Sequence, residues 1–501
     1  MTALYDEFKN YSGNDLYPCH MPGHKRHAFG AMSEEYASID FTEVDSLDDL
    51  HDPEGIILES EKNAAQTLGA DASYFLINGS TAGILAAVSA SVRKGGKLLM
   101  VRGSHKSAYN AAYLRGLRTA YIYTKGPDED GIFDAVTADD VKKALDENPD
   151  AGAVFIVSPT YEGRMSDIAS IAKEVHSKNI PLIVDEAHGA HLSFTKGCAS
   201  DAIRCGADIV IQSIHKTLPA PTQTAVLSVK GNLADKDGIR RFLSIYQSSS
   251  PSYPLMSMID GCIRYMSENS EKLVQNLHDN FENLLKRLEV CDKLICGPKT
   301  AELRSGKADY GKLVISARNT CISGKEIADI LRDRYRIETE MAAPGFVLAM
   351  FTVCDEPEGY DKVAGALTDL NTRLERYGLL AQDGEKPVDI STPLPKPVIR
   401  MSLSDAIDGD TEEIAFSESA GRISSSMVCL YPPGTPILAP GEEITAEHVK
   451  YIDNCLKAGF NVKGIERSGI KVVKNASSRP ETWKERWFRT CMAGFRPLWK
   501  P

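Results

Sequence analysis

Short apolar runs alternate with helical patterns through the middle of the chain. The runs, rich in valine, isoleucine and leucine, occupy positions 73–77, 97–101, 154–157, 181–184 and 209–211. Continuous apolar runs are typical of parallel strands that are covered on both faces. After the first run, apolar residues recur at helical spacing at Ile84, Ala87, Val88 and Val92. The pattern therefore predicts an α/β domain with a mainly parallel sheet.

The remaining segments suggest a division of the chain into four parts. The expected parts are an N-terminal arm (1–50), a large domain (51–300), a small α/β domain (301–390) and a C-terminal region (391–501). The arm is polar and irregular, and its stretch 18–26 either presents polar groups in a rigid loop or packs on a partner subunit. The large domain is expected to end in an amphipathic helix over 267–289.

The later segments carry more specific local signals. A strand is predicted over 312–316, followed by a helix that opens with a capping box of Ser323 and Glu326. Glu338 and Glu340 are expected to be solvated loop acids. Near the C-terminus, the proline-rich stretch 387–397 is typical of a connector, and Tyr431-Pro432-Pro433-Gly434 of a fixed turn.

Composition narrows the classes of function. With 501 residues, 43% hydrophobic and 25% charged, the chain is an ordinary globular protein. A net charge of −12 without a long basic run argues against nucleic acid or an anionic membrane as the main partner. The 11 cysteines include no C-x-x-C pair, which favours reduced thiols. The N-terminus resembles no signal peptide and no apolar run approaches a membrane span, so we expect a cytoplasmic protein.

A polar cluster follows each predicted strand. The clusters occupy 78–83, 102–107, 158–163, 185–191 and 212–218. Open α/β sheets bind ligands at the carboxyl ends of their strands. Several clusters at one edge indicate a ligand site more strongly than any one of them.

Lys216 suggests which ligand this edge binds. Lysine forms imines with pyridoxal 5'-phosphate, which also needs an acid at its ring nitrogen, a phosphate cradle and a face against its ring. The residues suited to these tasks are Lys216 for the imine, Asp185 for the ring nitrogen, Ser80, Thr81, Ser213 and His215 with the turn at Gly79 for the phosphate, and His105 for the ring face.

Several of these residues also fit an ordinary structural role. Lys216 fits an exposed loop lysine, and Asp185 fits a cap on the following turn. The serine and threonine after Gly79 fit an N-cap. His188 and His191 stand three apart without a third ligand pattern, so no metal site is expected.

Taken together, the clusters resemble the ornithine/lysine/arginine decarboxylases, which are bacterial fold type I pyridoxal-phosphate enzymes. The motifs that carry the resemblance are Asn-Gly-Ser-Thr-Ala-Gly at 78–83, Arg-Gly-Ser-His-Lys-Ser at 102–107, Asp-Glu-Ala-His-Gly-Ala-His at 185–191, Ser-Ile-His-Lys-Thr at 213–217, His-Met-Pro-Gly-His-Lys at 20–25 and Tyr-Pro-Pro-Gly at 431–434. The chain is similar to the short members, which lack an N-terminal wing domain.

The resemblance implies an aminotransferase-like fold with a seven-stranded, mainly parallel sheet and a smaller α/β C-terminal domain. It implies at least a homodimer with sites at the subunit interface, where the segment 250–253 reaches a neighbouring subunit's phosphate. It also implies that Thr160 and His188 lie near the cofactor ring and its phenolic oxygen. Ser425-Ser426 stands where relatives often carry Ala-Glu, which leaves the acid for a distal cation unassigned.

The expected activity is decarboxylation of a basic L-amino acid to CO2 and the corresponding di- or polyamine, with arginine first and lysine or ornithine next. Lys216, Asp185, His188 and His215 are the expected catalytic residues, and either Lys216 or His215 would return a proton to Cα. The alternatives are an aminotransferase or β-lyase on the same fold, and a non-catalytic protein that binds pyridoxal phosphate.

Overall fold

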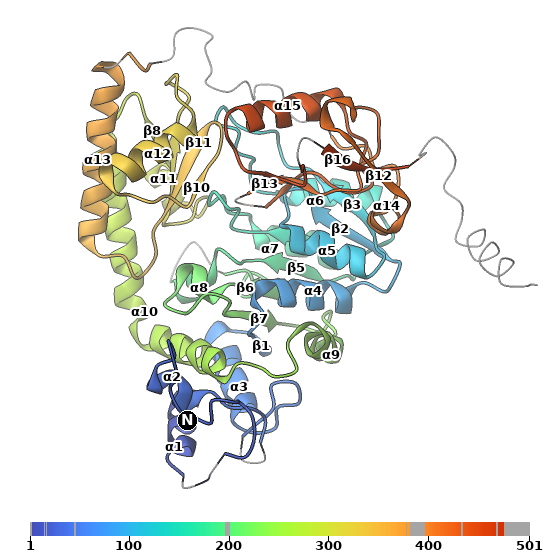
Figure 1. Ribbon diagram of the computed structural model, residues 1–501, viewed down its shortest axis with the longest axis vertical. Helices are drawn as coiled ribbons and strands as arrows, with labels where there is room; N and C mark the ends of the chain where they lie inside the picture. The colour runs from blue at the N-terminus through green and yellow to red at the C-terminus, as the bar shows by residue number, and fades with distance from the viewer. Residues whose placement is uncertain are drawn as a thin grey trace, which may run out of the picture.

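A seven-stranded sheet forms the centre of the computed structural model, which describes residues 3–14, 16, 18–44, 47–195, 201–376, 378–380, 396–431, 434–466 and 469–474 (Figure 1). Its strands are β1 (Ala72–Leu76), β2 (Lys97–Val101), β3 (Arg118–Ile122), β4 (Ala151–Val157), β5 (Leu182–Asp185), β6 (Ile209–Gln212) and β7 (Ala225–Val229). They lie in the order β1-β7-β6-β5-β4-β2-β3. Only β7 runs antiparallel to the other six strands, so the predicted, mainly parallel sheet is confirmed.

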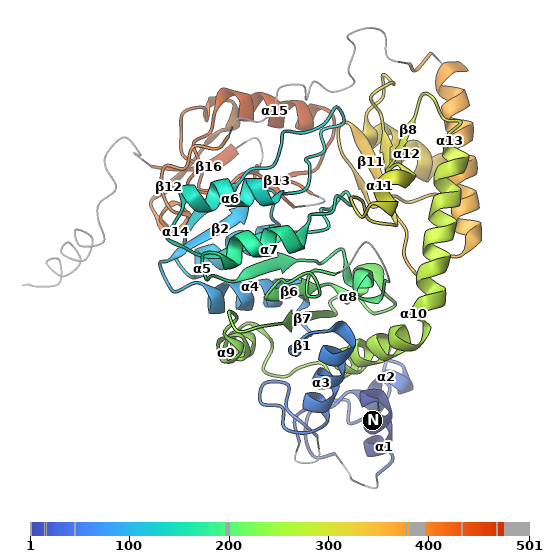
Figure 2. The same cartoon turned by 180° about the vertical axis from the view of Figure 1, so that it is seen from behind.

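Helices cover both faces of this sheet (Figure 2). One face carries α4 (Gly79–Ser91), α5 (Lys106–Leu114) and α9 (Lys236–Tyr246), and the other carries α6 (Ala138–Glu147) and α7 (Ile168–His176). Successive side chains of a strand point to opposite faces of the sheet. Phe155 packs with the first set of helices, and Val154 and Ile156 pack with the second. Burial on both faces explains why the strands read as continuous apolar runs.

The first fifty residues are more regular than the sequence indicated. They form α1 (Leu4–Ser12) and α2 (Glu34–Ile39), and α3 (Ile56–Leu68) follows. Leu4 and Phe8, one turn apart on α1, are buried, and the Phe8 ring lies 5.2 Å from that of Tyr253. The expectation of an irregular arm is therefore wrong for these helices, because so few apolar residues on a short helix leave a weak sequence pattern.

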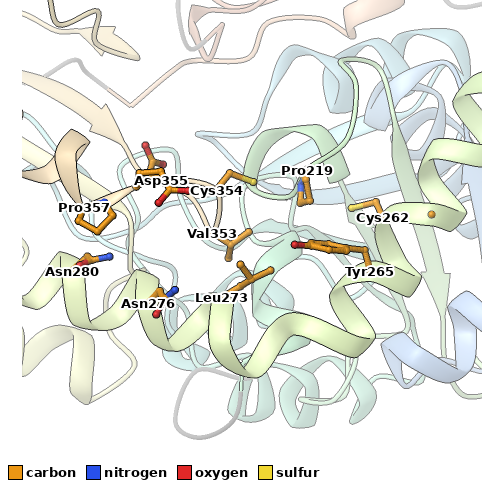
Figure 3. Close-up of a pocket in the computed structure, with 12 residues that line it drawn as sticks. Pro219, Cys262, Tyr265, Leu273, Asn276, Asn280, Val353, Cys354, Asp355 and Pro357 are labelled. Carbon is orange, nitrogen blue, oxygen red and sulfur yellow. The ribbon is translucent and has the colours of Figure 1, made fainter.

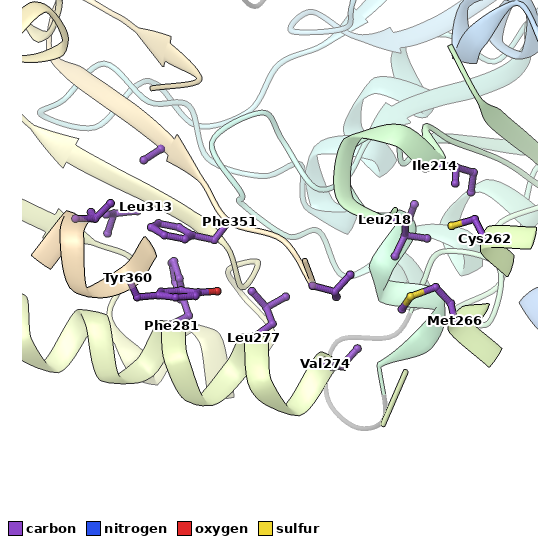
Figure 4. Packing of buried hydrophobic residues seen from close by; sticks show 14 of the residues in the cluster. Ile214, Leu218, Cys262, Met266, Val274, Leu277, Phe281, Leu313, Phe351 and Tyr360 are labelled. Atoms are coloured by element: carbon purple, nitrogen blue, oxygen red, sulfur yellow. The ribbon is translucent and has the colours of Figure 1, made fainter. Parts of the chain in front are cut away.

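The long helix α10 (Tyr253–Leu288) joins the main sheet to the second one. It begins 14 residues before the predicted start at Ser267. Pro254 lies in its first turn, where proline is tolerated, but proline and Gly261 together mask the helical pattern. Its buried face packs with residues of both sheets in one hydrophobic cluster, as Figure 4 shows for Met266, Phe281 and others.

The second sheet has the order β10-β11-β9-β8. Its strands are β8 (Ile295–Gly297), β9 (Lys312–Ser316), β10 (Met341–Ala342) and β11 (Phe346–Met350), and its helices are α11 (Thr300–Arg304), α12 (Gly324–Tyr335) and α13 (Pro357–Arg376). The predicted strand over 312–316 and the capping box of Ser323 and Glu326 are both confirmed. Because β8 pairs with β9, this unit starts before residue 301.

The C-terminal region packs beside β2, β3 and α5 (Figure 1). Its elements are α14 (Leu403–Asp408), β12 (Thr411–Ala415), the short 3-10 helix η2 (Phe416–Glu418), β13 (Val428–Leu430), β14 (Pro436–Leu438), α15 (Ala446–Lys457), β15 (Val462–Lys463) and β16 (Gly469–Val473). Most of the predicted connector over 387–397 lies outside the described residues, as do Pro432 and Pro433 of the predicted turn. Within the described parts, no helix has the length and apolar character that a membrane span needs.

A buried ion pair joins the C-terminal region to the main sheet. Arg102, at the end of β2, donates to Glu442 at 3.0 Å and to the carbonyl oxygens of Pro436 and Ile437. Burial raises the pKa of Glu442 although Arg102 opposes the shift, so the carboxylate depends on its partner charge. A buried pair of this kind destabilises a protein most when only one partner is removed.

Glu442→Gln is expected to lower the free energy of unfolding by about 3 kcal/mol, because the Arg102 guanidinium then stays buried without a counter-charge. Urea unfolding followed by circular dichroism measures the change. The matched control is Glu443→Gln, since Glu443 pairs with the exposed Arg400 and should change stability by less than about 1 kcal/mol. Equal losses in the two variants would contradict the assignment of Arg102 and Glu442 as an anchor.

Candidate active site

Lys216 lies at the carboxyl edge of the main sheet, on the short helix α8 (Ile214–Thr217) that follows β6. Ile214 and Leu218 on either side are buried in the core around α10, so the backbone at Lys216 is firmly held (Figure 4). The Lys216 amine lies 3.0 Å from Nε2 of His188. Burial lowers the pKa of Lys216, and Asp185 and Glu340 oppose the shift. The alternative of an exposed loop lysine is therefore wrong.

Asp185 is the last residue of β5 and is almost fully buried. One carboxylate oxygen accepts a hydrogen bond from the Ala187 amide at 3.1 Å, so Asp185 does cap the next turn, as the structural alternative held. Burial raises the pKa of Asp185, while the charge of Lys216 lowers it. A buried carboxyl with this limited support is suited to a cationic partner, which a protonated ring nitrogen would supply.

Hydroxyl groups gather at the N-terminus of α4. The Ser80 hydroxyl lies 2.7 Å from that of Ser213, and the Thr81 hydroxyl lies 3.2 Å from that of Ser107. No side chain caps the helix, so the alternative that this serine and threonine serve as N-caps is wrong. Gly79 begins the helix with φ +72°, a conformation that favours glycine. Free amides and hydroxyls at the positive end of a helix fit a phosphate.

His105 lies beside this cluster, at the N-cap of α5. Its Nδ1 lies 2.9 Å from the Ser107 hydroxyl. Burial lowers the pKa of His105 to about 4, and the charges of Lys216 and Lys106 add to the shift. A Cβ on Gly434 would lie 3.7 Å from His105 Nε2, so the end of the Tyr-Pro-Pro-Gly motif reaches the site.

The loop after β4 supplies Thr160 and Tyr161. The Thr160 hydroxyl accepts a hydrogen bond from the Arg164 amide at 3.1 Å. The Tyr161 ring lies edge-on to the His188 ring, with centroids 4.5 Å apart, and its hydroxyl donates to Glu340. Glu340 is exposed, as expected, but it is not merely a solvated loop acid, because it accepts a hydrogen bond from Tyr161 and its charge opposes the lowering of the Lys216 pKa by burial.

His215, next to the candidate lysine, is turned toward the backbone. Its Nδ1 lies 2.9 Å from the Thr224 carbonyl oxygen, to which it donates. Burial lowers the pKa of His215, although the bond to Thr224 opposes the shift. The ring is therefore neutral near pH 7, with its one proton on Nδ1.

Lys312 is a site residue that the sequence did not reveal. It is the first residue of β9 in the second sheet, and the sequence predicts that a lysine at this position is exposed to solvent. The structure buries it to 2% exposure, with its amine 3.3 Å from Nδ1 of His188. His188 thus has one lysine at each ring nitrogen, and nothing in the local sequence could have signalled this contact.

The donor set fits pyridoxal 5'-phosphate. Lys216 offers an amine, Asp185 a buried acid, His105 a neutral flat ring, and the residues around Gly79 a phosphate cradle. All of them lie at one edge of the sheet, as the strand order requires. The structure also places His188 beside the lysine and Thr160 on a neighbouring loop.

A separate cavity of about 690 Å³ lies between α10 and the segment 353–357 (Figure 3). It is lined by α10 residues, among them Cys262, Tyr265 and Asn276, and by the segment from Val353 to Pro357. Among the described residues that line it, Pro219 alone comes from the sheet-edge loops. The cavity and the polar edge of the sheet are therefore different sites.

Comparison with known proteins identifies the protein family. The family model "Orn/Lys/Arg decarboxylase, major domain" matches residues 2–299, and the model of that family's C-terminal domain matches residues 391–474. An arginine decarboxylase of Bacillus subtilis is 32% identical over 94% of this chain and 97% of its own length. The inducible lysine decarboxylase of Escherichia coli is 23% identical over 87% of this chain and 74% of its own length.

Solved structures confirm the expected fold type I architecture. A lysine decarboxylase of Francisella novicida has a TM-score of 0.79 at 18% identity, over 94% of this chain and 81% of that one. A ureidoglycine-glyoxylate aminotransferase of Bacillus subtilis has a TM-score of 0.51 at 15% identity, over 66% of this chain and 88% of that one. The aminotransferase-like fold predicted from the motifs is therefore correct.

Lys216→Ala is expected to abolish the adduct that borohydride reduction fixes between the chain and pyridoxal 5'-phosphate, because the amine with the lowered pKa is removed. Mass spectrometry of the reduced protein measures the adduct. The control is Lys106→Ala, which removes an exposed lysine at the start of α5 and should leave the adduct intact. An adduct that survives in Lys216→Ala would mean that another lysine carries the cofactor.

Proposed function

The chain belongs to the Orn/Lys/Arg decarboxylase family, whose members are pyridoxal-phosphate-dependent carboxy-lyases, and we propose that it decarboxylates arginine, with lysine and ornithine as the next candidates. The observation that carries the proposal is the convergence of Lys216, Asp185 and the hydroxyl cluster at one edge of the sheet. Relatives named arginine decarboxylase, at 30–32% identity, support arginine as the first choice.

The cofactor-binding residues follow from the donor set. Lys216 would hold the aldehyde carbon of pyridoxal 5'-phosphate, and Asp185 would hold the ring nitrogen. His105 would lie on the ring, and His188 and Thr160 would lie near the phenolic oxygen. The phosphate would bind at Gly79, Ser80, Thr81 and Ser213; His215 is the remaining proposed phosphate residue, although its Nδ1 proton is held by the Thr224 carbonyl.

When bound, the cofactor supplies an aldehyde for the substrate amine and a ring that accepts the electron pair released with CO2. The task of Asp185 is to keep a proton on the ring nitrogen. Asp185 is buried and accepts a hydrogen bond from the Ala187 amide, so a protonated ring nitrogen would be a favourable additional partner for its carboxylate. The loops around Lys216 exclude water, since His188 and Ser213 are buried.

Lys216 is favoured over His215 as the donor of a proton to Cα. His215 keeps its one proton on Nδ1 for the Thr224 carbonyl, and burial lowers its pKa, so it has no second proton to give near neutral pH. The Lys216 amine instead contacts Nε2 of His188, a group that can exchange protons with it. His188 acts beside Lys216 in this proposal.

Glu340 is our candidate for the carboxylate that meets the distal cation of the substrate. It is exposed, it accepts a hydrogen bond from the Tyr161 hydroxyl, and its charge acts on the pKa of Lys216. The chain carries Ser425-Ser426 where relatives often have Ala-Glu, so a carboxylate from another segment has to serve this purpose.

We also propose a cytoplasmic homodimer or higher homo-oligomer with sites at the subunit interface. The proposed division of the chain keeps its four parts, with the small α/β unit beginning at β8, before residue 301. Exposed apolar side chains at Met21 (60%) and Phe29 (68%) support an N-terminal segment that packs on a partner subunit. Of the segment 250–253, Ser250 is exposed and Ser252 is half-buried, whereas Pro251 and Tyr253 are buried within this chain, so the proposed contact with a neighbouring site would involve the two serines.

Incubation of the loaded enzyme with arginine, lysine and ornithine in parallel is expected to release CO2 and the matching amine, fastest from arginine. Trapped CO2 and chromatography of the amines measure the products. Keto acid without CO2 would replace the proposal with an aminotransferase or β-lyase reaction. Cofactor absorbance without turnover of any of the three would replace it with a non-catalytic binding protein.

Asp185→Asn is expected to retain the cofactor but to lower kcat by roughly a hundredfold or more, because an amide cannot hold the proton on the ring nitrogen. Cofactor absorbance and CO2 release measure the two effects. Asp146→Asn, an exposed carboxylate paired with Lys178, is the control and should change neither. A kcat near that of the wild type in Asp185→Asn would remove the electrostatic role.

A further inference from the structure

Lys312, His188 and Lys216 form a continuous chain of nitrogen atoms. The Lys312 amine lies 3.3 Å from His188 Nδ1, and the Lys216 amine lies 3.0 Å from His188 Nε2. Lys312 begins β9 of the second sheet, whereas Lys216 lies on α8 at the edge of the main sheet, and His188 between them is 6% exposed. The stem of Lys312 is also tightly enclosed, since a Cβ on Gly163 would lie 2.6 Å from Lys312 Cβ.

No carboxylate of the described residues lies within ion-pair distance of the Lys312 amine, which is unusual for a lysine that is fully buried. Asp309 uses one oxygen for His191 at 2.7 Å and acts on Lys312 only at a distance. Burial lowers the pKa of Lys312, and Asp309 and Glu340 oppose the shift. Lys312 can therefore lose its proton without leaving a buried charge unpaired.

Hydrogen-bond rules allow this chain to carry one net positive charge. An ammonium group only donates, and a neutral imidazole has one donor nitrogen and one acceptor nitrogen. If Lys312 is charged, it donates to Nδ1, and Nε2–H donates to a neutral Lys216. If Lys216 is charged, the pattern is reversed. An imidazolium between two neutral amines connects the two states.

We propose that Lys312 is the buried end of a proton relay that runs through His188 to Lys216. Lys312 acts through His188 and is therefore a positioning residue for the proton. In one passage, the proton of Lys312 moves to Nδ1, His188 releases its Nε2 proton to Lys216, and Lys216 gives a proton to Cα. Lys312 remains as a neutral amine, and water restores the proton when the product leaves.

The relay extends the proposed function. Only its last step, the transfer of a proton to Cα, depends on the proposed decarboxylation. Replacement of a carboxylate by hydrogen consumes one proton in each turnover, and a buried site has to deliver it. The charged and titratable groups that surround the relay lie on several elements. They are Asp185 at the end of β5, His105 at the N-cap of α5, His215 on α8, Tyr161 and Glu162 after β4, Asp309 before β9, and Glu340 before β10.

The test measures the pKa of the Lys216 amine in the full chain without cofactor. Trace labelling with acetic anhydride from pH 6 to 11, with mass spectrometry of the Lys216 peptide, gives this pKa without any turnover. A failed relay and a failed decarboxylase assignment are therefore distinguishable. Circular dichroism and thermal unfolding establish that each variant is folded.

Three substitutions separate the relay from simple packing. Lys312→Met and Lys312→Gln cannot hold a proton, so the Lys216 pKa is expected to rise by about one unit or more in both. Lys312→Arg keeps a permanent charge that fixes the proton of His188 on Nε2, so the Lys216 pKa is expected to fall. Lys97→Met, which removes a lysine paired with Asp150 far from the site, should cause no shift.

Shifts in opposite directions for the neutral and the charged substitution support the relay, because a packing defect would not follow the sign of the charge. An unchanged Lys216 pKa in Lys312→Met or in Lys312→Gln overturns the relay. The Lys216 pKa would then not depend on a transferable proton at position 312. If the arginine variant does not fold, the methionine and glutamine variants still decide the question.

Discussion

The contact of the Lys216 amine with a neutral, buried histidine is the interaction on which the site depends. A lysine in water is an ammonium and a poor nucleophile, so the fold has to remove this one from water without giving it a close carboxylate. His188 makes that possible because it hydrogen-bonds the amine while burial and the neighbouring lysines hold its own pKa well below the usual range. Asp185 and Glu340 act from farther away and limit the shift.

This contact requires two sheets in a fixed relation, and α10 supplies it. Its N-terminal half packs with α1 and α8, and its C-terminal half packs with β9 and α13 in the same hydrophobic cluster. Leu313, the neighbour of Lys312, lies in that cluster near Phe281 (Figure 4). The helix therefore sets the distance between the lysine of one sheet and the histidine of the other.

The C-terminal region completes the site from a third direction. Arg102 binds Glu442 and begins the loop that ends at His105. Gly434, on the other side of the contact, approaches the His105 ring. This buried ion pair thus joins the strand end that precedes His105 to the region that carries Gly434, which links the stability of the C-terminal region to the geometry of the candidate site.

The candidate site was predictable wherever it depends on strand order. Asp185, Ser213 and Lys216 follow apolar runs, and the carboxyl ends of parallel strands meet at one edge whatever the rest of the chain does. The helices α1 and α2 and the start of α10 were missed, because short or proline-containing helices leave a weak periodic pattern. For these segments, tertiary packing outweighs the local signal.

The sequence by itself determined the type of sheet, the edge that carries the candidate site and the candidate lysine at its centre, because these follow from local runs of apolar and polar residues. Only the tertiary structure decided that Glu340 holds Tyr161 and that Lys312 reaches His188. The local sequence around a lysine at the start of a strand does not distinguish an exposed lysine from a buried one. Its environment comes from a segment more than a hundred residues away, and that contact exists only in the folded chain.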